Sequence, residues 1–152
     1  CDYLVLLWQT FHGMDYEAQA IRIKIFCYYY NFTRIVIDKT VLGSGVFQEV
    51  KKFYPMAIGL DYNAALKNEM VLKTQTLIQK RRLKFDGNEI ITSFMTVKKR
   101  ITGTGKITYV SDRSEDASHG DLSWAIMNCI LNVPYGLGGD VSSTKSTIFT
   151  FE

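Results

Sequence analysis

Two aspartates stand where side chains commonly meet ligands. Asp38 ends the β-branched run of residues 34–38, ahead of a glycine-containing turn, and Asp121 opens an amphipathic segment after a polar stretch. Ligands of α/β sheets bind outside the carboxyl ends of the strands, so we expect Asp38 to act in function. Asp121 has a structural alternative, because an aspartate in a first helical turn also suits the helix dipole.

Two carboxylates that converge from separate elements would bind Mg²⁺ or Mn²⁺, hard ions that prefer oxygen ligands. Such ions cleave phosphodiesters in pairs, about 3.5–4 Å apart, where one helps to generate hydroxide and the other stabilises the leaving oxygen. Other chemistries lack their motifs: no GxSxG, P-loop or HExxH is present, and His12 and His119 are far apart in the sequence. The pattern favours metal-dependent chemistry on a phosphate.

The elements that must position these acids alternate along the chain. Strands are expected at residues 3–11, 34–38, 56–60 and 83–85, and helices at 15–30, 46–53, 64–80, 90–95 and 121–131. Residues 97–101 and 106–110 flank Thr-Gly-Thr-Gly, which predicts a β-hairpin. This order predicts an α/β sheet of crossover units with an added hairpin.

The first helix offers a specific expectation. Asp15 is its predicted N-cap, and Ala18, Ile21, Ile25 and Tyr29 share one apolar face. Residues 28–30 are three consecutive tyrosines at a helix end. We expect one or two of the rings to pack and the rest to be amphipathic surface, rather than a platform on which single strands stack.

Composition sets broad limits. The 152 residues suit one domain, and a net charge of +3 is too small to imply a polyanionic partner by itself. No apolar run reaches the roughly eighteen residues of a membrane span, so no membrane partner is expected. The three cysteines lack a CxxC spacing, which argues against a disulfide framework or zinc site and fits a reducing cytosol.

Several segments, in order, resemble the large terminase subunits of tailed bacteriophages, in the branch found in temperate, contractile-tailed phages. They are residues 11–20 (FHGMDYEAQA), 35–40 (IVIDKT), 43–46 (GSGV), 72–74 (LKT), 82–86 (RLKFD), 101–109 (ITGTGKITY) and 113–125 (RSEDASHGDLSWA). The resemblance runs from about residue 6 to Pro134. It implies a ribonuclease-H-like mixed sheet flanked by helices, which cuts double-stranded DNA with an acidic cluster and divalent metal.

Within that resemblance, Asp38 matches the acid after the family's central strand, and Asp121 matches the acid that opens its last core helix. The family's first metal-binding aspartate lies on a strand upstream of the segment matching residues 15–20. Asp2 is near the corresponding end, but its surroundings do not match. We therefore expect residues 1–134 to be a nuclease domain lacking its first strand, with an incomplete metal site, and residues 135–152 to be a flexible tail.

A packaging nuclease should contact mainly phosphates. The hairpin cations are the first candidates for DNA binding, against a merely solvated hairpin: Lys98, Lys99, Arg100 and Lys106. Lys73 is a second candidate, on the expectation that it projects from its helix, against the alternative of an ordinary exposed helix lysine. Arg113, ahead of Asp121, would approach a phosphate or pair with a nearby acid.

The leading hypothesis is thus a metal-dependent endonuclease domain that cuts concatemeric viral DNA during packaging. The resemblance implies a terminase small subunit and the capsid portal as partners of the full-length protein. It also implies the host bacterial cytoplasm, with transient residence at the procapsid portal. No Walker-type motif is present, so ATP hydrolysis is not expected of this chain. Alternatives are a catalytically incomplete module that binds DNA or the portal, and another ribonuclease-H-like enzyme such as a resolvase.

Overall fold

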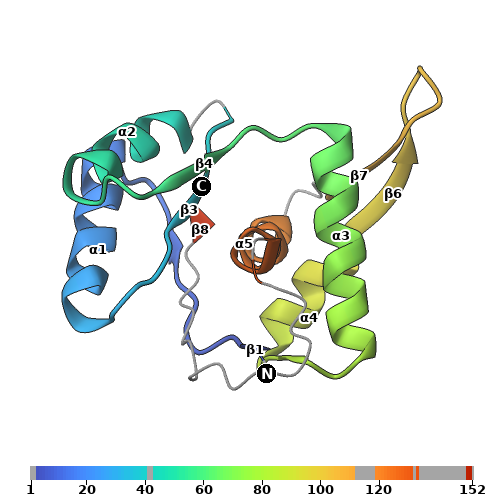
Figure 1. Cartoon of the computed structure of the whole chain (residues 1–152), viewed down its shortest axis with the longest axis horizontal. Helices are drawn as coiled ribbons and strands as arrows, with labels where there is room; N and C mark the ends of the chain where they lie inside the picture. The colour runs from blue at the N-terminus through green and yellow to red at the C-terminus, as the bar shows by residue number, and fades with distance from the viewer. Residues whose placement is uncertain (1–2, 41–42, 112–118, 132, 134–149, 152) are drawn as a thin grey trace.

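The computed structural model describes residues 3–40, 43–111, 119–131, 133 and 150–151 (Figure 1). The helices in these ranges are α1 Tyr16–Tyr29, α2 Gly43–Phe53, α3 Ala64–Gln79, α4 Asn88–Met95 and α5 His119–Leu131. The strands are β1 Tyr3–Leu4, β2 Thr10–Phe11, β3 Val36–Asp38, β4 Ile58–Leu60, β5 Leu83–Lys84, β6 Val97–Ile101, β7 Ile107–Ser111 and β8 Thr150–Phe151. The alternation of strands and helices predicted from the sequence is confirmed.

The described strands pair two at a time. β1 with β5, β2 with β8, and β3 with β4 are parallel pairs, whereas β6 and β7 form the predicted antiparallel hairpin. Parallel neighbours require a crossover connection, and α2 supplies it between β3 and β4. Asp38 is paired in register with Leu60, so both strands end at the same level.

Helix α5 occupies the centre of the molecule (Figure 1). It contacts α3 and α4 as well as β3 and β8, which explains why its side chains are buried around most of its circumference. Ile126 and Ile130 pack with β1, α3, β5 and α4, while Trp124 and Met127 pack against α3. Each such side chain contributes about 1.5–3 kcal/mol when fully buried. Among the described residues, no helix combines the length and apolar composition needed to cross a membrane.

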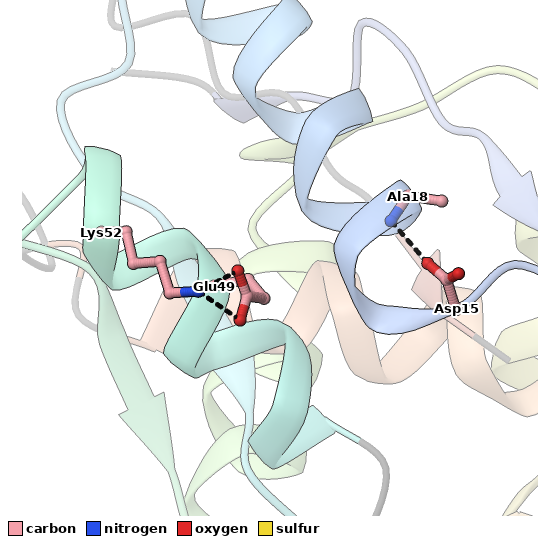
Figure 2. Close-up of polar contacts among 4 residues, drawn as sticks. All are labelled: Asp15, Ala18, Glu49 and Lys52. Atoms are coloured by element: carbon pink, nitrogen blue, oxygen red, sulfur yellow. Dashed lines mark hydrogen bonds and ion pairs between the residues drawn. The ribbon is translucent and has the colours of Figure 1, made fainter.

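Helices α1 and α2 pack against each other and cover β3. Asp15 caps α1 as predicted, because its Oδ1 accepts a hydrogen bond of 2.7 Å from the Ala18 amide (Figure 2). On α2, the Lys52 ammonium pairs with Glu49 at 2.6 Å. That pair is exposed, so it contributes at most about 0.5 kcal/mol.

The predicted apolar face of α1 is wrong. Ile21, Ile25 and Tyr29 are exposed, and the helix instead buries Gln19, Ala20 and Ile23 against α2 and β3. In the tyrosine run, the Tyr30 ring lies 6.2 Å from the rings of Phe26 and Phe32, whereas Tyr28 and Tyr29 are 87% and 73% exposed, which agrees with the expectation that one or two rings pack.

Several boundaries differ from the expectations. The strand expected over residues 3–11 is reduced to β1 and β2, and α2 begins three residues earlier than predicted. In the expected tail, residues 134–149 and 152 lie outside the described ranges, and residues 150–151 pair with β2 as strand β8.

Helix α3 ends in a Schellman motif. The Arg82 amide bonds to the Leu77 carbonyl at 2.8 Å, and the Arg81 amide bonds to the Ile78 carbonyl at 2.9 Å. Arg81 has φ of 54°, the left-handed conformation that glycine usually provides at this position. The backbone at Arg81 is therefore strained.

Candidate functional site

Asp38 lies at the carboxyl end of β3, as the sequence predicts, and is partly buried. Its Oδ1 accepts hydrogen bonds from the amide and the hydroxyl of Thr40, at 2.8 and 2.7 Å. This local turn holds the carboxylate in one orientation. Within the described part of the chain no hydrogen bond engages Oδ2, so that oxygen can accept from a ligand.

The backbone around Asp38 is packed too closely for side chains at two nearby glycines. A Cβ on Gly43 would stand 1.6 Å from the Asp38 carbonyl oxygen, so only glycine lets α2 begin against β3. A Cβ on Gly59 would stand 2.4 Å from the Lys39 side chain, which crosses that glycine to pair with Asp61 at 2.8 Å. Both contacts fix the strand end from which Asp38 projects.

Asp121 lies in the first turn of α5 and is exposed. The start of this helix is pressed against the end of β7, because a Cβ on Gly120 would stand 2.3 Å from the Ser111 Cβ. One turn along, the Trp124 indole donates to the Ser111 hydroxyl at 2.7 Å. The backbone at Asp121 is thus held in place by Gly120 before it and Trp124 after it, both of which contact Ser111. An aspartate that served only to cap the helix would not require this packing.

Tyr62, two residues after β4, lies close to both acids. Burial raises the pKa of Tyr62 most, the charge of Asp38 raises it further, and Asp121 adds to this, while the hydrogen bond to Asn128 opposes them. Charges on two carboxylates act on one phenol only when both lie near it, since water screens distant pairs. Both carboxylates are therefore near enough to Tyr62 to act on its pKa, and they come from β3 and α5, two elements that contact each other.

Polar and aromatic side chains surround the phenol of Tyr62. Tyr62 donates to Asn128 Oδ1 at 2.7 Å, and its ring lies 5.6 Å from the Trp124 ring. The Lys67 ammonium lies 5.6 Å from the Tyr62 ring centroid and 5.3 Å from that of Trp124.

The sequence analysis did not predict that Tyr62, Asn128 and Lys67 belong to this site. The rule that selected Asp38 could have found Tyr62, because it also follows the carboxyl end of a parallel strand. Asn128 carried a weaker signal, as a polar residue in the otherwise apolar α5. Lys67 looked like any helix lysine, and only the fold brings it to the rings of Tyr62 and Trp124.

The prediction that Lys73 projects from its helix is wrong. Its side chain is 6% exposed, and its ammonium donates to the Leu131 and Val133 carbonyls at the end of α5. Burial lowers the pKa of Lys73. Its charge satisfies carbonyl groups that the end of a helix leaves without partners.

The hairpin cations are exposed as expected: Lys98, Lys99, Arg100 and Lys106. The hairpin projects from the body of the molecule beside α3 (Figure 1). Arg113 lies outside the described residues, and of His119 only the backbone, at the start of α5, is described.

Asp38 and Asp121 offer the oxygen ligands that suit a hard divalent cation. The described residues contain no group of three or more histidine, cysteine, aspartate or glutamate side chains placed to hold a metal. Asp38 and Asp121 can therefore supply part of the ligand set of a divalent metal ion, because both carry carboxylate oxygens and both lie near Tyr62.

Comparison with known proteins adds sequence relatives. Residues 2–133 match the family of terminase RNaseH-like domains. The chain is 41% identical to the terminase ATPase subunit of Escherichia phage P2 over 152 residues, which are 98% of this chain and 26% of the relative. It is 34% identical to the probable terminase ATPase subunit of Haemophilus phage HP1 over 132 residues, 84% of this chain and 22% of that one. The chain spans about a quarter of the length of these curated relatives.

The fold is similar to solved structures of the large terminase nuclease from thermophilic phage G20c. The structure with bound magnesium aligns with a TM-score of 0.62 and 16% identity, over 78% of this chain and 61% of the other. The structure with bound cobalt aligns with a TM-score of 0.61 and 17% identity, over 80% and 62%. Together with the family match, this likeness confirms the predicted ribonuclease-H-like α/β fold.

Proposed function

Because this chain belongs to the terminase RNaseH-like domain family, we propose that it is the nuclease domain of a phage large terminase subunit. In this proposal it cuts concatemeric double-stranded viral DNA during genome packaging. One observation supports this most: Asp38 and Asp121 come from β3 and α5, two elements that contact each other, and the charges of both raise the pKa of Tyr62. The G20c nuclease structures, with bound magnesium or cobalt, agree with a divalent metal as cofactor.

Asp38 and Asp121 would hold Mg²⁺ or Mn²⁺ in this proposal. A bound ion supplies Lewis-acid activation of the phosphodiester and neutralises charge that develops during cleavage. Thr40 contributes by holding the Asp38 carboxylate, which leaves Oδ2 turned to no other described donor. Packing of Gly43 and Gly120 fixes the two backbones, so the distance between the acids is set before DNA binds.

The β6–β7 hairpin is the proposed DNA-contacting arm. No acid among the described residues forms an ion pair with Lys99, Arg100 or Lys106, so their charges are available to phosphates. Lys98 lies on the same strand, and Arg113 follows the hairpin in sequence. Lys73 is left out of this surface, because its ammonium is buried at the end of α5.

Further proposals concern the full-length protein. We propose that it works with a terminase small subunit and with the capsid portal. We further propose that it acts in the host bacterial cytoplasm and resides transiently at the procapsid portal. Support comes from the sequence relatives, which are terminase ATPase subunits of phages.

A second function is a DNA- or portal-binding module that does not cut. The observation in its favour is that only two acids converge among the described residues, without a third metal-binding side chain. Family membership disfavours the third alternative, a resolvase.

Cleavage of supercoiled plasmid with Mg²⁺ or Mn²⁺ tests the proposal. The parent should nick and linearise the plasmid, and Asp38→Asn and Asp121→Asn should each reduce cutting at least about 100-fold. Glu49→Gln is the control, because it removes an acid that pairs with Lys52 on the exposed surface of α2. A parent that binds duplex DNA but never cuts would favour the binding module. Cutting that survives both substitutions would place the reaction elsewhere.

A further inference from the structure

Lys67 is a cation over the rings of Tyr62 and Trp124 that nothing described so far employs. It lies in the first turns of α3 and is partly buried. Its ammonium stands 5.6 Å from the centroid of the Tyr62 ring and 5.3 Å from that of Trp124. Two rings within about 6 Å hold a cation by attraction to their faces, which limits the wandering that a lysine side chain normally shows.

The two rings that lie beside the Lys67 ammonium are themselves held in place. Tyr62 is fixed by its hydrogen bond to Asn128, and Trp124 by its hydrogen bond to Ser111, both 2.7 Å long. The two rings also contact each other, with centroids 5.6 Å apart. The Lys67 amide bonds to the Asn63 carbonyl at 3.0 Å, and the Asn63 side chain caps the same helix. Both ends of Lys67 are therefore held in place: its backbone by the start of α3, and its ammonium by the two rings.

The charge of Lys67 is not neutralised within the described part of the chain. No carboxylate there lies within ion-pair distance of its ammonium, whereas Lys39 and Lys52 each have an acidic partner. Its three N–H groups point at no described acceptor, and the aromatic rings take up none of them as conventional hydrogen bonds. The ammonium can thus donate to an anion from outside.

Tyr62 links this cation to the acids. The Lys67 ammonium lies over the Tyr62 ring, and Tyr62 follows Leu60, which is paired in register with Asp38. The ammonium also lies over Trp124, which is one turn after Asp121 on α5. The Lys67 ammonium is fixed in this part of the fold and forms no ion pair with Asp38 or Asp121. It can therefore bind a phosphate that the two carboxylates bind through a metal cation. Lysine serves such a phosphate as a point charge with several donors.

We propose that Lys67 is a catalytic residue that donates to a non-bridging oxygen of the DNA phosphate held between Asp38 and Asp121. This inference rests on the proposed nuclease function and adds a DNA contact at the point of cutting, separate from the hairpin. A simpler role for Lys67 is to brace the two rings, and the experiment separates the two roles.

Lys67→Met keeps the apolar stem and removes the charge, and Lys67→Arg keeps the charge. Lys24→Met is the matched control, because Lys24 also lies over a ring, 5.8 Å from the Phe53 centroid, but it extends from α1 to a ring of α2 and not to Tyr62 or Trp124. Duplex DNA binding is measured at several salt concentrations with Ca²⁺, a hard cation that oxygen ligands bind, in place of Mg²⁺, and plasmid cleavage is measured with Mg²⁺. Thermal melting verifies that each variant is folded.

For Lys67→Met we expect the slope of log affinity against log salt to fall by about one, as for the loss of one phosphate contact. Cutting should fall about 100-fold, Lys67→Arg should restore most of the slope, and Lys24→Met should match the parent in both readouts. An unchanged slope in a folded Lys67→Met variant would overturn the proposal, even if cutting were lost. Failure of the proposed function is visible separately, since then the parent itself would not cut, whether or not it binds DNA.

Discussion

Replacing Lys73 with methionine should destabilise the fold and leave DNA binding unchanged. The ammonium donates to the Leu131 and Val133 carbonyls, where α5 ends. Hydrogen bonds to charged groups contribute about 1.5–3 kcal/mol each. The Val133 contact is only partly buried, so water can replace it, whereas the Leu131 contact is buried. Methionine keeps the volume of the lysine stem but loses both hydrogen bonds. The variant also avoids the cost of burying a charge, which offsets part of this loss, so we expect the free energy of unfolding to fall by about 2–4 kcal/mol.

Thermal and urea unfolding measure this loss. At about 2–4 °C per kcal/mol for a domain of this size, the Tm should fall by about 4–16 °C. Lys80→Met, an exposed lysine at the end of the same helix, is the control and should change stability by less than about 0.5 kcal/mol. Duplex DNA affinity, measured well below both melting temperatures, should be the same for the parent and both variants.

The pH dependence gives a second readout. Burial lowers the pKa of Lys73, so between that lowered value and about 10.4 in the unfolded chain, the unfolded state binds more protons. The stability of the parent relative to Lys73→Met should therefore rise as the pH rises through this window. The reasoning is refuted if Lys73→Met melts like Lys80→Met, or if it loses DNA affinity while keeping its stability.

Three further predictions follow from local geometry. Arg81→Gly should stabilise the fold by about 0.5–1 kcal/mol in urea unfolding, because glycine adopts the positive φ without strain; a loss of stability would contradict this. Gly43→Ala should cost about 3 kcal/mol and abolish cutting, since its Cβ would collide with the Asp38 carbonyl oxygen; a stable, active variant would refute that packing. Burial raises the pKa of the Cys129 thiol to about 12, partly offset by Arg34, so at pH 8 it should be alkylated about 1000-fold more slowly than a free thiol; mass spectrometry of the native and urea-unfolded protein tests this.

The local features that the sequence predicted depend on short-range rules. Asp15 caps α1, the hairpin forms around Thr-Gly-Thr-Gly, and β3 ends at Asp38, since each depends on residues adjacent in the chain. The position of Asp38 as a candidate ligand followed for the same reason, because a strand end is recognisable without knowing its neighbours.

Burial was less predictable, because two helical stripes of α1 have the same spacing. Ala18, Ile21 and Ile25 repeat every three or four residues, and so do Ala20, Ile23 and Cys27. Periodicity alone cannot choose between them, and α2 with β3 selects the second stripe by packing against it. Lys73 was mistaken for a surface residue because the carbonyls that it binds belong to a segment 58 residues away.

By itself, the sequence determined the order of the elements, the hairpin, the family resemblance and the two acids. The tertiary structure alone decided that the charges of Asp38 and Asp121 both act on Tyr62, that Lys67 lies over the Tyr62 ring, and that Lys73 does not reach the surface. The physical reason is range: caps, turns and strand ends depend on neighbours within a few residues, whereas a site assembled from β3, β4, α3 and α5 depends on how those elements pack.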